Sequence, residues 1–106
     1  LGRGSVCINS GGEKIYPEEV EVAARKHPNV IDANVVGVPH ERFGETVLLV
    51  CSVSEATSDA DIISTVKASI ADYKAPRRVV FVDEVDRAPN GKADYRWAKE
   101  QALATT

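Results

Sequence analysis

Methionine is absent from the 106-residue sequence, and cysteine occurs only twice. Because no initiator methionine is present, we expect the chain to be a piece of a longer protein. Cys7 and Cys51 are too few for a disulfide scaffold, and the Cys and His spacings of zinc sites are missing. Both cysteines lie in short apolar stretches, so we expect buried free thiols in a protein of the reducing cytoplasm.

Long hydrophobic runs are also missing. No stretch of about 18 apolar residues could span a membrane, and the first residues lack the apolar centre of a signal peptide. The sequence has 13 basic and 16 acidic residues, a net charge of −3, which disfavours a basic nucleic-acid binder. With 43% hydrophobic and 27% charged residues, the composition is typical of one globular domain and not of a disordered chain.

The charge is unevenly distributed along the chain. Residues 1–73 carry 6 basic and 11 acidic side chains, whereas residues 74–99 carry 7 basic and 4 acidic ones, a balance of +3. Such a segment could attract an anionic small molecule, or it could be an ordinary solvated face of mixed charge. Charge alone favours the second interpretation.

The first part of the chain predicts a β-hairpin followed by a helix. A hairpin over residues 6–16 fits the pair Gly11-Gly12, because glycine reaches the positive φ of a tight turn without strain. Pro17 suits the first position of a helix, where its missing N–H is not needed. Acidic residues that follow it favour the positive end of the helix dipole: Glu18, Glu19 and Glu21.

The remainder of the chain alternates strand and helix patterns. Runs rich in β-branched residues predict three strands, at residues 30–38, 46–53 and 78–82. Ser58, with Asp61 three residues later, forms a short version of a capping box and predicts a helix start. A last helix is expected over about residues 94–103. These elements predict an α+β domain with an N-terminal β-hairpin and a roughly three-stranded sheet packed by helices.

One candidate for chemistry is Lys92, which follows Asn90-Gly91 just before the last helix. A lysine at such a loop tip can carry a positive charge into a partner's active site, although an exposed turn lysine is the favoured local interpretation. The sequence is not a phosphate-binding P-loop, because Asp86 replaces its first glycine and Ala93 stands where serine or threonine is needed.

A second candidate is the segment Ser10-Gly11-Gly12-Glu13. Glycines let a backbone approach a ligand closely, and they also form simple hairpin turns. The local sequence favours the simple turn. His27 and His40 lie far apart, without carboxylate or cysteine clusters at metal spacing, so we expect no metal ligand in this chain.

Further blocks occur in a fixed order along nearly the whole chain. They are Gly2-Arg3, Ser10 to Glu21, His27-Pro28-Asn29-Val30, Val36 to Glu45, Tyr73 to Arg77, Phe81 to Val85, and Pro89-Asn90-Gly91-Lys92. Together these blocks resemble the C-terminal domain of acyl-CoA synthetases. This family belongs to the adenylate-forming superfamily, with luciferases and the adenylation domains of nonribosomal peptide synthesis. The tail over residues 93–99 is similar to that of actinobacterial fatty acyl-CoA ligases.

The resemblance implies an activity shared between two domains. Members of the family use ATP and Mg²⁺ to convert a carboxylic acid into an acyl-adenylate and pyrophosphate. Coenzyme A then attacks the adenylate and releases the thioester and AMP. A large N-terminal domain, absent from residues 1–106, holds most of the nucleotide and acyl sites. The small C-terminal domain rotates over them as a lid between the two half-reactions, so the isolated domain is expected to be inactive.

The resemblance also assigns roles to residues of this chain. Lys92 matches the catalytic lysine of adenylation. A hinge is expected at Arg3 and Ser5, although serine here replaces the usual lysine or aspartate and Val6 follows where aspartate is common. The hairpin residues expected to line the pantetheine path of coenzyme A are Asn9, Ser10, Gly11, Gly12, Glu13 and Lys14.

The expected partners are the protein's own N-terminal domain and the substrates fatty acid, ATP and coenzyme A. A lysine acetyltransferase acting on Lys92 is a further expected partner, because family members are often acetylated there. The sequence leaves two alternatives open. One is a stand-alone binding or regulatory module, and the other is part of an enzyme that loads acyl groups onto a carrier protein.

Overall fold

The computed structural model describes residues 7–91 and 94–104, and there it has five strands, three α-helices and one 3₁₀ turn. In chain order the elements are β1 (Ile8–Ser10), β2 (Glu13–Ile15), α1 (Pro17–Ala24), β3 (Val30–His40), β4 (Gly44–Val53), α2 (Asp59–Ser69), η1 (Asp72–Lys74), β5 (Arg78–Phe81) and α3 (Tyr95–Ala104). No helix in these described ranges is long and apolar enough to cross a membrane. The α+β prediction is confirmed.

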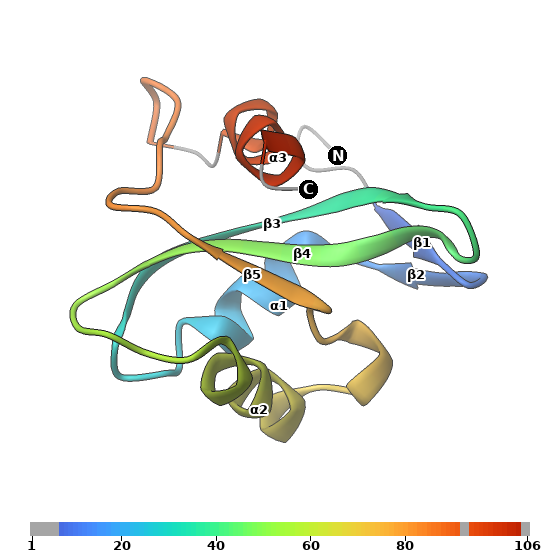
Figure 1. Ribbon diagram of the computed structural model, residues 1–106, viewed down its shortest axis with the longest axis horizontal. Helices are drawn as coiled ribbons and strands as arrows, with labels where there is room; N and C mark the ends of the chain where they lie inside the picture. The colour runs from blue at the N-terminus through green and yellow to red at the C-terminus, as the bar shows by residue number, and fades with distance from the viewer. Residues whose placement is uncertain (1–6, 92–93, 105–106) are drawn as a thin grey trace.

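A single sheet joins all five strands, in the order β2-β1-β4-β3, with β5 beside β4 (Figure 1). The long pair β3 and β4 is antiparallel, whereas β4 and β5 are parallel. The hairpin β1–β2 joins the sheet through one register pair, Ser10 with Gly44. The predicted hairpin and the predicted three-stranded sheet are therefore parts of the same sheet.

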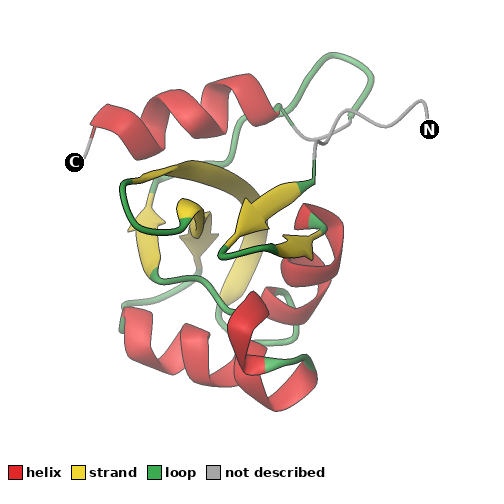
Figure 2. Ribbon diagram, turned by 90° about the vertical axis from the view of Figure 1, so that its right-hand side faces the viewer, coloured by secondary structure: helices red, strands yellow, loops and turns green. Residues whose placement is uncertain are grey.

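Helices cover both faces of the sheet: α1 and α2 lie on one face and α3 on the other (Figures 1 and 2). Side chains of β4 alternate between the two cores, because successive residues of a strand point to opposite faces. Leu49 packs against α1 and α2, and Leu48 packs against Ala98 and Ala102 of α3. β4 is buried on both faces, which explains its nearly continuous apolar sequence.

The turn between β3 and β4 is shorter than the sequence suggested. The sequence predicted strands at residues 30–38 and 46–53, but most of the residues between them are also strand, and only residues 41–43 separate β3 from β4. The imidazole Nδ1 of His40 accepts hydrogen bonds from the backbone N–H groups of Arg42 (3.1 Å) and Phe43 (3.3 Å). Gly44 follows with a φ of 83°. These contacts satisfy the turn locally and let both strands extend into it.

The predicted cap of α2 is confirmed for Ser58, whose hydroxyl accepts a hydrogen bond from the backbone N–H of Asp61 at 3.1 Å. The Asp61 carboxylate has another partner: it lies 2.9 Å from Nε2 of His27, a buried residue just after α1. Since Nδ1 of His27 accepts a hydrogen bond from the backbone N–H of Asn29, Nε2 carries the proton donated to Asp61. This contact links the end of α1 to the start of α2.

Glu21 occupies a backbone donor on the free edge of strand β3. The sequence placed Glu21 with the acidic residues that favour the helix dipole, but its side chain is buried, and its Oε2 accepts a hydrogen bond from the backbone N–H of Val35 at 2.9 Å. The first-turn acidic residues are Glu18 and Glu19 alone. Further along the edge, Pro39 has no N–H to offer.

Candidate functional site

The hairpin tip is a two-residue glycine turn. Strands β1 and β2 pair Asn9 with Lys14 and Ser10 with Glu13. Gly11 and Gly12 between them have φ values of 58° and 89°. Two successive positive φ values define a type I′ turn, whose twist matches that of the flanking strands. The predicted turn is confirmed, and a Cβ on Gly12 would meet nothing within 4 Å, so its backbone is open to a partner.

The hairpin is fixed to the start of β4 by two backbone donors. The N–H of Gly11 donates to the carbonyl of Phe43 at 3.0 Å, and the N–H of Asn9 donates to the Glu45 carboxylate at 3.0 Å. Gly37 of β3 leaves the space for Glu45, because a Cβ there would lie 3.1 Å from the carboxylate carbon. The orientation of the hairpin therefore depends on one acidic side chain and one missing side chain.

Aromatic and basic groups gather beside the hairpin tip. The Phe43 ring stacks on the ring of His40 at a centroid distance of 4.8 Å, and the Arg77 guanidinium lies 5.1 Å from the Phe43 centroid. Arg77 is exposed, and its backbone N–H is held by the carbonyl of Val47 at 2.9 Å. A cation beside a half-buried ring suits anionic and planar ligand groups. We call His40, Phe43 and Arg77 the tip cluster.

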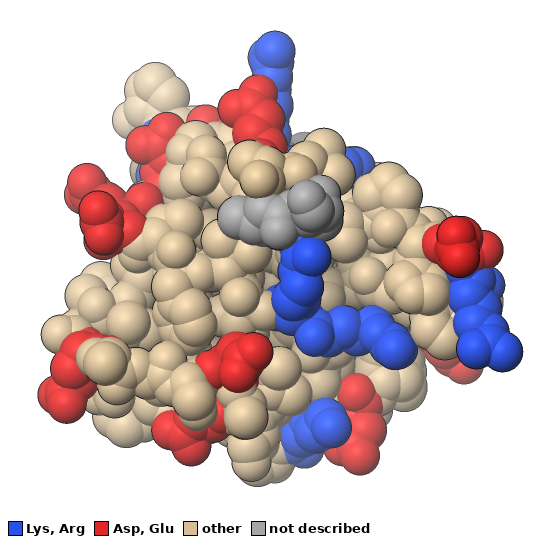
Figure 3. All heavy atoms as spheres, in the orientation of Figure 1, with Lys and Arg blue, Asp and Glu red and all other residues tan. Residues whose placement is uncertain are grey.

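Basic side chains gather over β5 on the face shown in Figure 3, with acidic side chains around the margin of that face. Arg77 and Arg78 stand at the start of β5. Arg77 and Arg78 thus place two positive charges of residues 74–99 at the start of β5, with the Arg77 guanidinium beside Phe43.

The loop that precedes Lys92 ends in a tight turn. The N–H of Gly91 donates to the carbonyl of Ala88 at 2.8 Å, with Pro89 and Asn90 between them. No non-glycine residue of the described part has a positive φ, so the turn is not type II. Gly91 itself has a φ of 84°, which an L side chain adopts only with strain.

The base of this loop is tied to β3. The Arg87 guanidinium donates two hydrogen bonds to the Asp32 carboxylate, from Nε to Oδ2 at 2.8 Å and from Nη2 to Oδ1. Burial opposes ionisation of Asp32, but the hydrogen bonds from Arg87 and from the backbone N–H of Ala33 outweigh it and hold the pKa of the carboxyl below its usual value. Arg25 adds a second positive group, at 3.8 Å from Oδ1.

After the loop, hydrogen bonds of Asp94 and Tyr95 hold the chain in place where α3 begins. The Asp94 carboxylate accepts a hydrogen bond from the backbone N–H of Trp97 at 3.0 Å, as expected of an N-cap residue. The Tyr95 hydroxyl donates to Oε1 of Glu21 at 3.2 Å. Burial, followed by the effect of Glu21, raises the pKa of Tyr95, and burial also raises the pKa of the Glu21 carboxyl.

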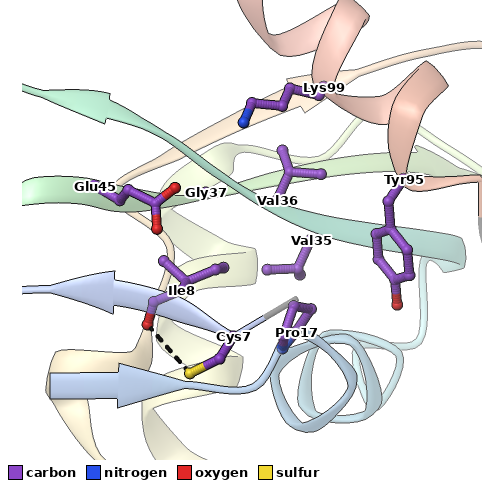
Figure 4. Close-up of a pocket in the computed structure, with 9 residues that line it drawn as sticks. All are labelled: Cys7, Ile8, Pro17, Val35, Val36, Gly37, Glu45, Tyr95 and Lys99. Carbon is purple, nitrogen blue, oxygen red and sulfur yellow. Dashed lines mark hydrogen bonds between the residues drawn. The ribbon is translucent and has the colours of Figure 1, made fainter. Parts of the chain in front are cut away.

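A small cavity of about 250 Å³ lies between β1, β3, α1 and α3 (Figure 4). Its walls are largely apolar, with Glu45 and Lys99 placing one charge of each sign at its margin. Cys7 lines this cavity and is only partly buried, so the prediction of buried thiols is wrong for Cys7. Cys51 is buried, and burial raises its pKa to about 11, so it stays a neutral thiol at physiological pH.

Some predicted site residues lie outside the described part of the chain, namely Lys92 and the hinge residues Arg3 and Ser5. Within residues 7–91 and 94–104, no three His, Cys, Asp or Glu residues gather in a way that could hold a metal ion.

The family of the AMP-binding enzyme C-terminal domain matches residues 19–92, which is more than half of the chain. The chain belongs to this family. As a C-terminal domain it spans about a fifth of the length of the curated relatives that it matches.

Those relatives are CoA ligases by name. The chain is 59% identical over 103 residues to 3-oxocholest-4-en-26-oate–CoA ligase of Rhodococcus rhodochrous, covering 95% of the chain and 19% of the relative. It is 58% identical over 106 residues to the medium/long-chain-fatty-acid–CoA/3-oxocholest-4-en-26-oate–CoA ligase of Mycobacterium tuberculosis, covering 98% of the chain and 19% of the relative.

Solved structures share the fold. The fatty acyl CoA synthetase of Mycobacterium tuberculosis matches with a TM-score of 0.86 and 33% identity, over 93% of this chain and 20% of that one. Apo MatB from Rhodopseudomonas palustris matches with a TM-score of 0.86 and 32% identity, over 99% of this chain and 21% of that one.

In this AMP-binding enzyme C-terminal domain, the hairpin tip and the loop before Lys92 lie far apart along the long axis, the hairpin tip at the right and the loop at the upper left of Figure 1. The structure brings the hairpin residues together with the tip cluster, and it separates all of them from the loop. Sequence reasoning missed the tip cluster. The blocks Val36 to Glu45 and Tyr73 to Arg77 contain its members, but nothing in the sequence shows that Arg77 lies over Phe43.

Proposed function

We propose that the chain is the mobile C-terminal domain of an ATP-dependent, AMP-forming fatty acyl-CoA ligase. Membership of the AMP-binding enzyme C-terminal domain family supports this, as do relatives at 58–59% identity that are named as CoA ligases. Two of those relatives are named for a steroid carboxylate or for medium- and long-chain fatty acids, so we propose a large hydrophobic carboxylic acid as the substrate.

The observation that carries the proposal is the placement of the two candidate loops. The hairpin tip and the loop before Lys92 lie at opposite ends of the domain (Figure 1), so both cannot enter one active site at the same time. A ligase forms first an adenylate and then a thioester, and each loop can serve one of these two steps. Rotation of the whole domain would present one loop and then the other.

In the adenylation step, Lys92 would contact the substrate carboxylate and the α-phosphate of ATP. Negative charge develops on phosphate oxygens as pyrophosphate leaves, and a compact ammonium group stabilises that charge most strongly in a site closed to water. The N-terminal domain, which these 106 residues do not include, would hold most of ATP and its Mg²⁺.

In the thioester step, the hairpin of residues 9–14 would line the path of the pantetheine arm. Gly12 offers a backbone without side-chain hindrance, and the glycine turn fixes its direction. The tip cluster places Arg77 on the same side, where its guanidinium would attract the phosphates of coenzyme A. The free state of Cys7 and Cys51 fits a reducing compartment, and we propose the cytoplasm.

The test is a comparison of the two half-reactions in the full-length protein, wild type and Lys92→Ala. Fatty-acid-dependent ATP–pyrophosphate exchange should fall by about 10²-fold or more, the scale for losing one transition-state contact. Conversion of supplied acyl-adenylate to acyl-CoA should survive. Unchanged exchange would refute the role of Lys92, and the domain would then be a lid or a partner-binding module of the full-length protein.

The acceptor is tested separately, by offering coenzyme A or a phosphopantetheinylated carrier protein to the enzyme with acyl-adenylate bound. We expect coenzyme A to be the better acceptor; transfer to the carrier protein alone would assign the chain to an acyl-loading enzyme. Acetylation of Lys92 by a lysine acetyltransferase stays a prediction, and mass spectrometry of the protein from its native cells tests it.

A further inference from the structure

The segment that carries Lys92 is fastened to the sheet on both sides. Before it, Arg87 binds Asp32 through two hydrogen bonds, and after it, the Tyr95 hydroxyl binds Glu21 at 3.2 Å. Glu21 in turn accepts a hydrogen bond from the backbone N–H of Val35 at 2.9 Å. Both attachments therefore end on β3, at positions three residues apart.

The Asp32–Arg87 pair is built more firmly than an ordinary surface ion pair. The Asp32 side chain is 22% exposed and that of Arg87 is 32% exposed. A two-bond contact between a guanidinium and a carboxylate fixes direction as well as distance. The remaining capacity of the carboxylate is used by the backbone N–H of Ala33 at 2.9 Å and by Arg25 at 3.8 Å. Three groups therefore hold the Asp32 carboxylate in place, and its fixed orientation restricts where the Arg87 guanidinium can lie.

The geometry of the loop shows what such a restraint can achieve. From Arg87 the chain runs through the turn of Ala88 to Gly91 and reaches Asp94, the cap of α3, within seven residues. In the described residues, Arg87 is held on β3 and residues 88–91 form a hydrogen-bonded turn, so this part of the loop has little freedom to change direction. Positioning matters in adenylation, because a displacement of about 1 Å can cost about 10²-fold in rate.

We propose that Asp32 and Arg87 are positioning residues for adenylation: their contact fixes the loop on β3 so that Lys92 enters the active site in a productive direction. This inference rests on the proposed function of Lys92. Neither residue touches a substrate in this role. Their effect is confined to the half-reaction that uses the loop, because the hairpin that serves the thioester step lies at the other end of the domain.

The test uses the full-length enzyme with the variants Asp32→Asn, Arg87→Gln and Arg87→Lys, beside Lys92→Ala. The matched control is Glu19→Gln, which breaks the ion pair between Glu19 and Lys74 (2.9 Å). That pair also joins residues 55 positions apart, and it connects α1 to η1 instead of the loop to β3. Each variant is assayed for ATP–pyrophosphate exchange, for conversion of supplied acyl-adenylate to acyl-CoA, and for hydrogen exchange of residues 86–91.

We expect Asp32→Asn and Arg87→Gln to lower the maximal rate of pyrophosphate exchange about tenfold or more, with the thioester step within about twofold of wild type. Arg87→Lys keeps the charge but not the two-bond geometry, so its loss should be intermediate. Amide exchange over residues 86–91 should become faster in both disruptive variants and stay unchanged in Glu19→Gln.

Three results would overturn the inference. The first is faster amide exchange with unchanged adenylation, while Lys92→Ala abolishes adenylation; the proposed function would then stand without the positioning role. The second is an equal loss in both half-reactions, or a loss equal to that of Glu19→Gln, which would indicate stability alone. The third is full adenylation by Lys92→Ala, which would remove the proposed function of Lys92 and the positioning role with it.

Discussion

Glu45 reaches across to the backbone N–H of Asn9 because Gly37, which lies beside it on β3, has no side chain. A Cβ at Gly37 would lie 3.0 Å from Cγ2 of Ile8 and 3.1 Å from Oε2 of Glu45. Asn9, Gly37 and Glu45 come from β1, β3 and β4, and together they fix the hairpin on the sheet. Two of the three lie far from the hairpin in the sequence.

The first prediction concerns Gly37→Ala. The added methyl group must displace Ile8 or Glu45, so the free energy of unfolding should fall by about 1–3 kcal/mol, as in other overpacked cores. Urea denaturation measures this change. In Glu45→Ala the clash partner is shortened, so the double variant should lose less than the sum of the two single losses. Strict additivity would show that Gly37 and Glu45 are not coupled.

The second prediction concerns Asp32→Asn and pH. The folded state lowers the pKa of Asp32 below the model-compound value of 3.8, so its carboxylate stabilises the fold above that pH. At pH 7 the variant should be less stable by about 1 kcal/mol, the upper range for a partly exposed pair. The difference should shrink below pH 3.8 and disappear as the pH falls through the lower pKa of the folded state. A difference that persists in acid would assign the loss to packing instead of charge.

The third prediction concerns Glu21→Gln, for which the expected dependence of stability on pH is opposite to that of Asp32→Asn. The folded state raises the pKa of Glu21 above the model-compound value of 4.5, mainly through burial. The protonated Glu21 carboxyl therefore favours the folded state below pH 4.5, and this contribution to stability is lost as the pH rises through the pKa of the folded state. A glutamine does not titrate and can still accept from the N–H of Val35. The stability of the variant relative to wild type should therefore improve from pH 4 to pH 7, and a pH-independent difference would contradict this.

The fourth prediction concerns Asn34, whose amide is fully buried with no hydrogen-bond partner for either polar atom in the described structure. An unsatisfied buried amide costs about 1–3 kcal/mol. Asn34→Leu has a similar shape without the polar atoms, so it should raise the free energy of unfolding by about 1 kcal/mol. Thermal unfolding measures the change. A destabilised variant would indicate that a bound water satisfies Asn34.

Local signals in the sequence were sufficient for much of the fold. Gly11 and Gly12 predicted the hairpin turn, Pro17 the start of α1 and Ser58 the cap of α2, because each acts through its own backbone or the next few residues. The ends of β3 and β4 were predicted less well. Their extension depends on His40, whose imidazole replaces missing backbone partners in a turn that looked like a longer loop.

Contacts between distant residues could not be predicted in this way. Glu21 resembled a dipole partner because it follows Glu18 and Glu19, yet its partners Val35 and Tyr95 are 14 and 74 residues away. Arg87 and Asp32 are 55 residues apart. Nothing in a single sequence shows which charged residues the sheet register will bring together. The role of Lys92 came from the resemblance alone and stays a prediction.

The capped edge of β3 has a consequence for how this domain meets other chains. A free strand edge is a template on which a second strand can assemble, and in a protein that recruits large partners it invites aggregation. Here the N–H of Val35 is occupied by Glu21, and Pro39 offers no donor. This stretch of β3 therefore offers an incoming strand few free backbone donors, and a partner protein that meets the domain here engages side chains instead of extending the sheet.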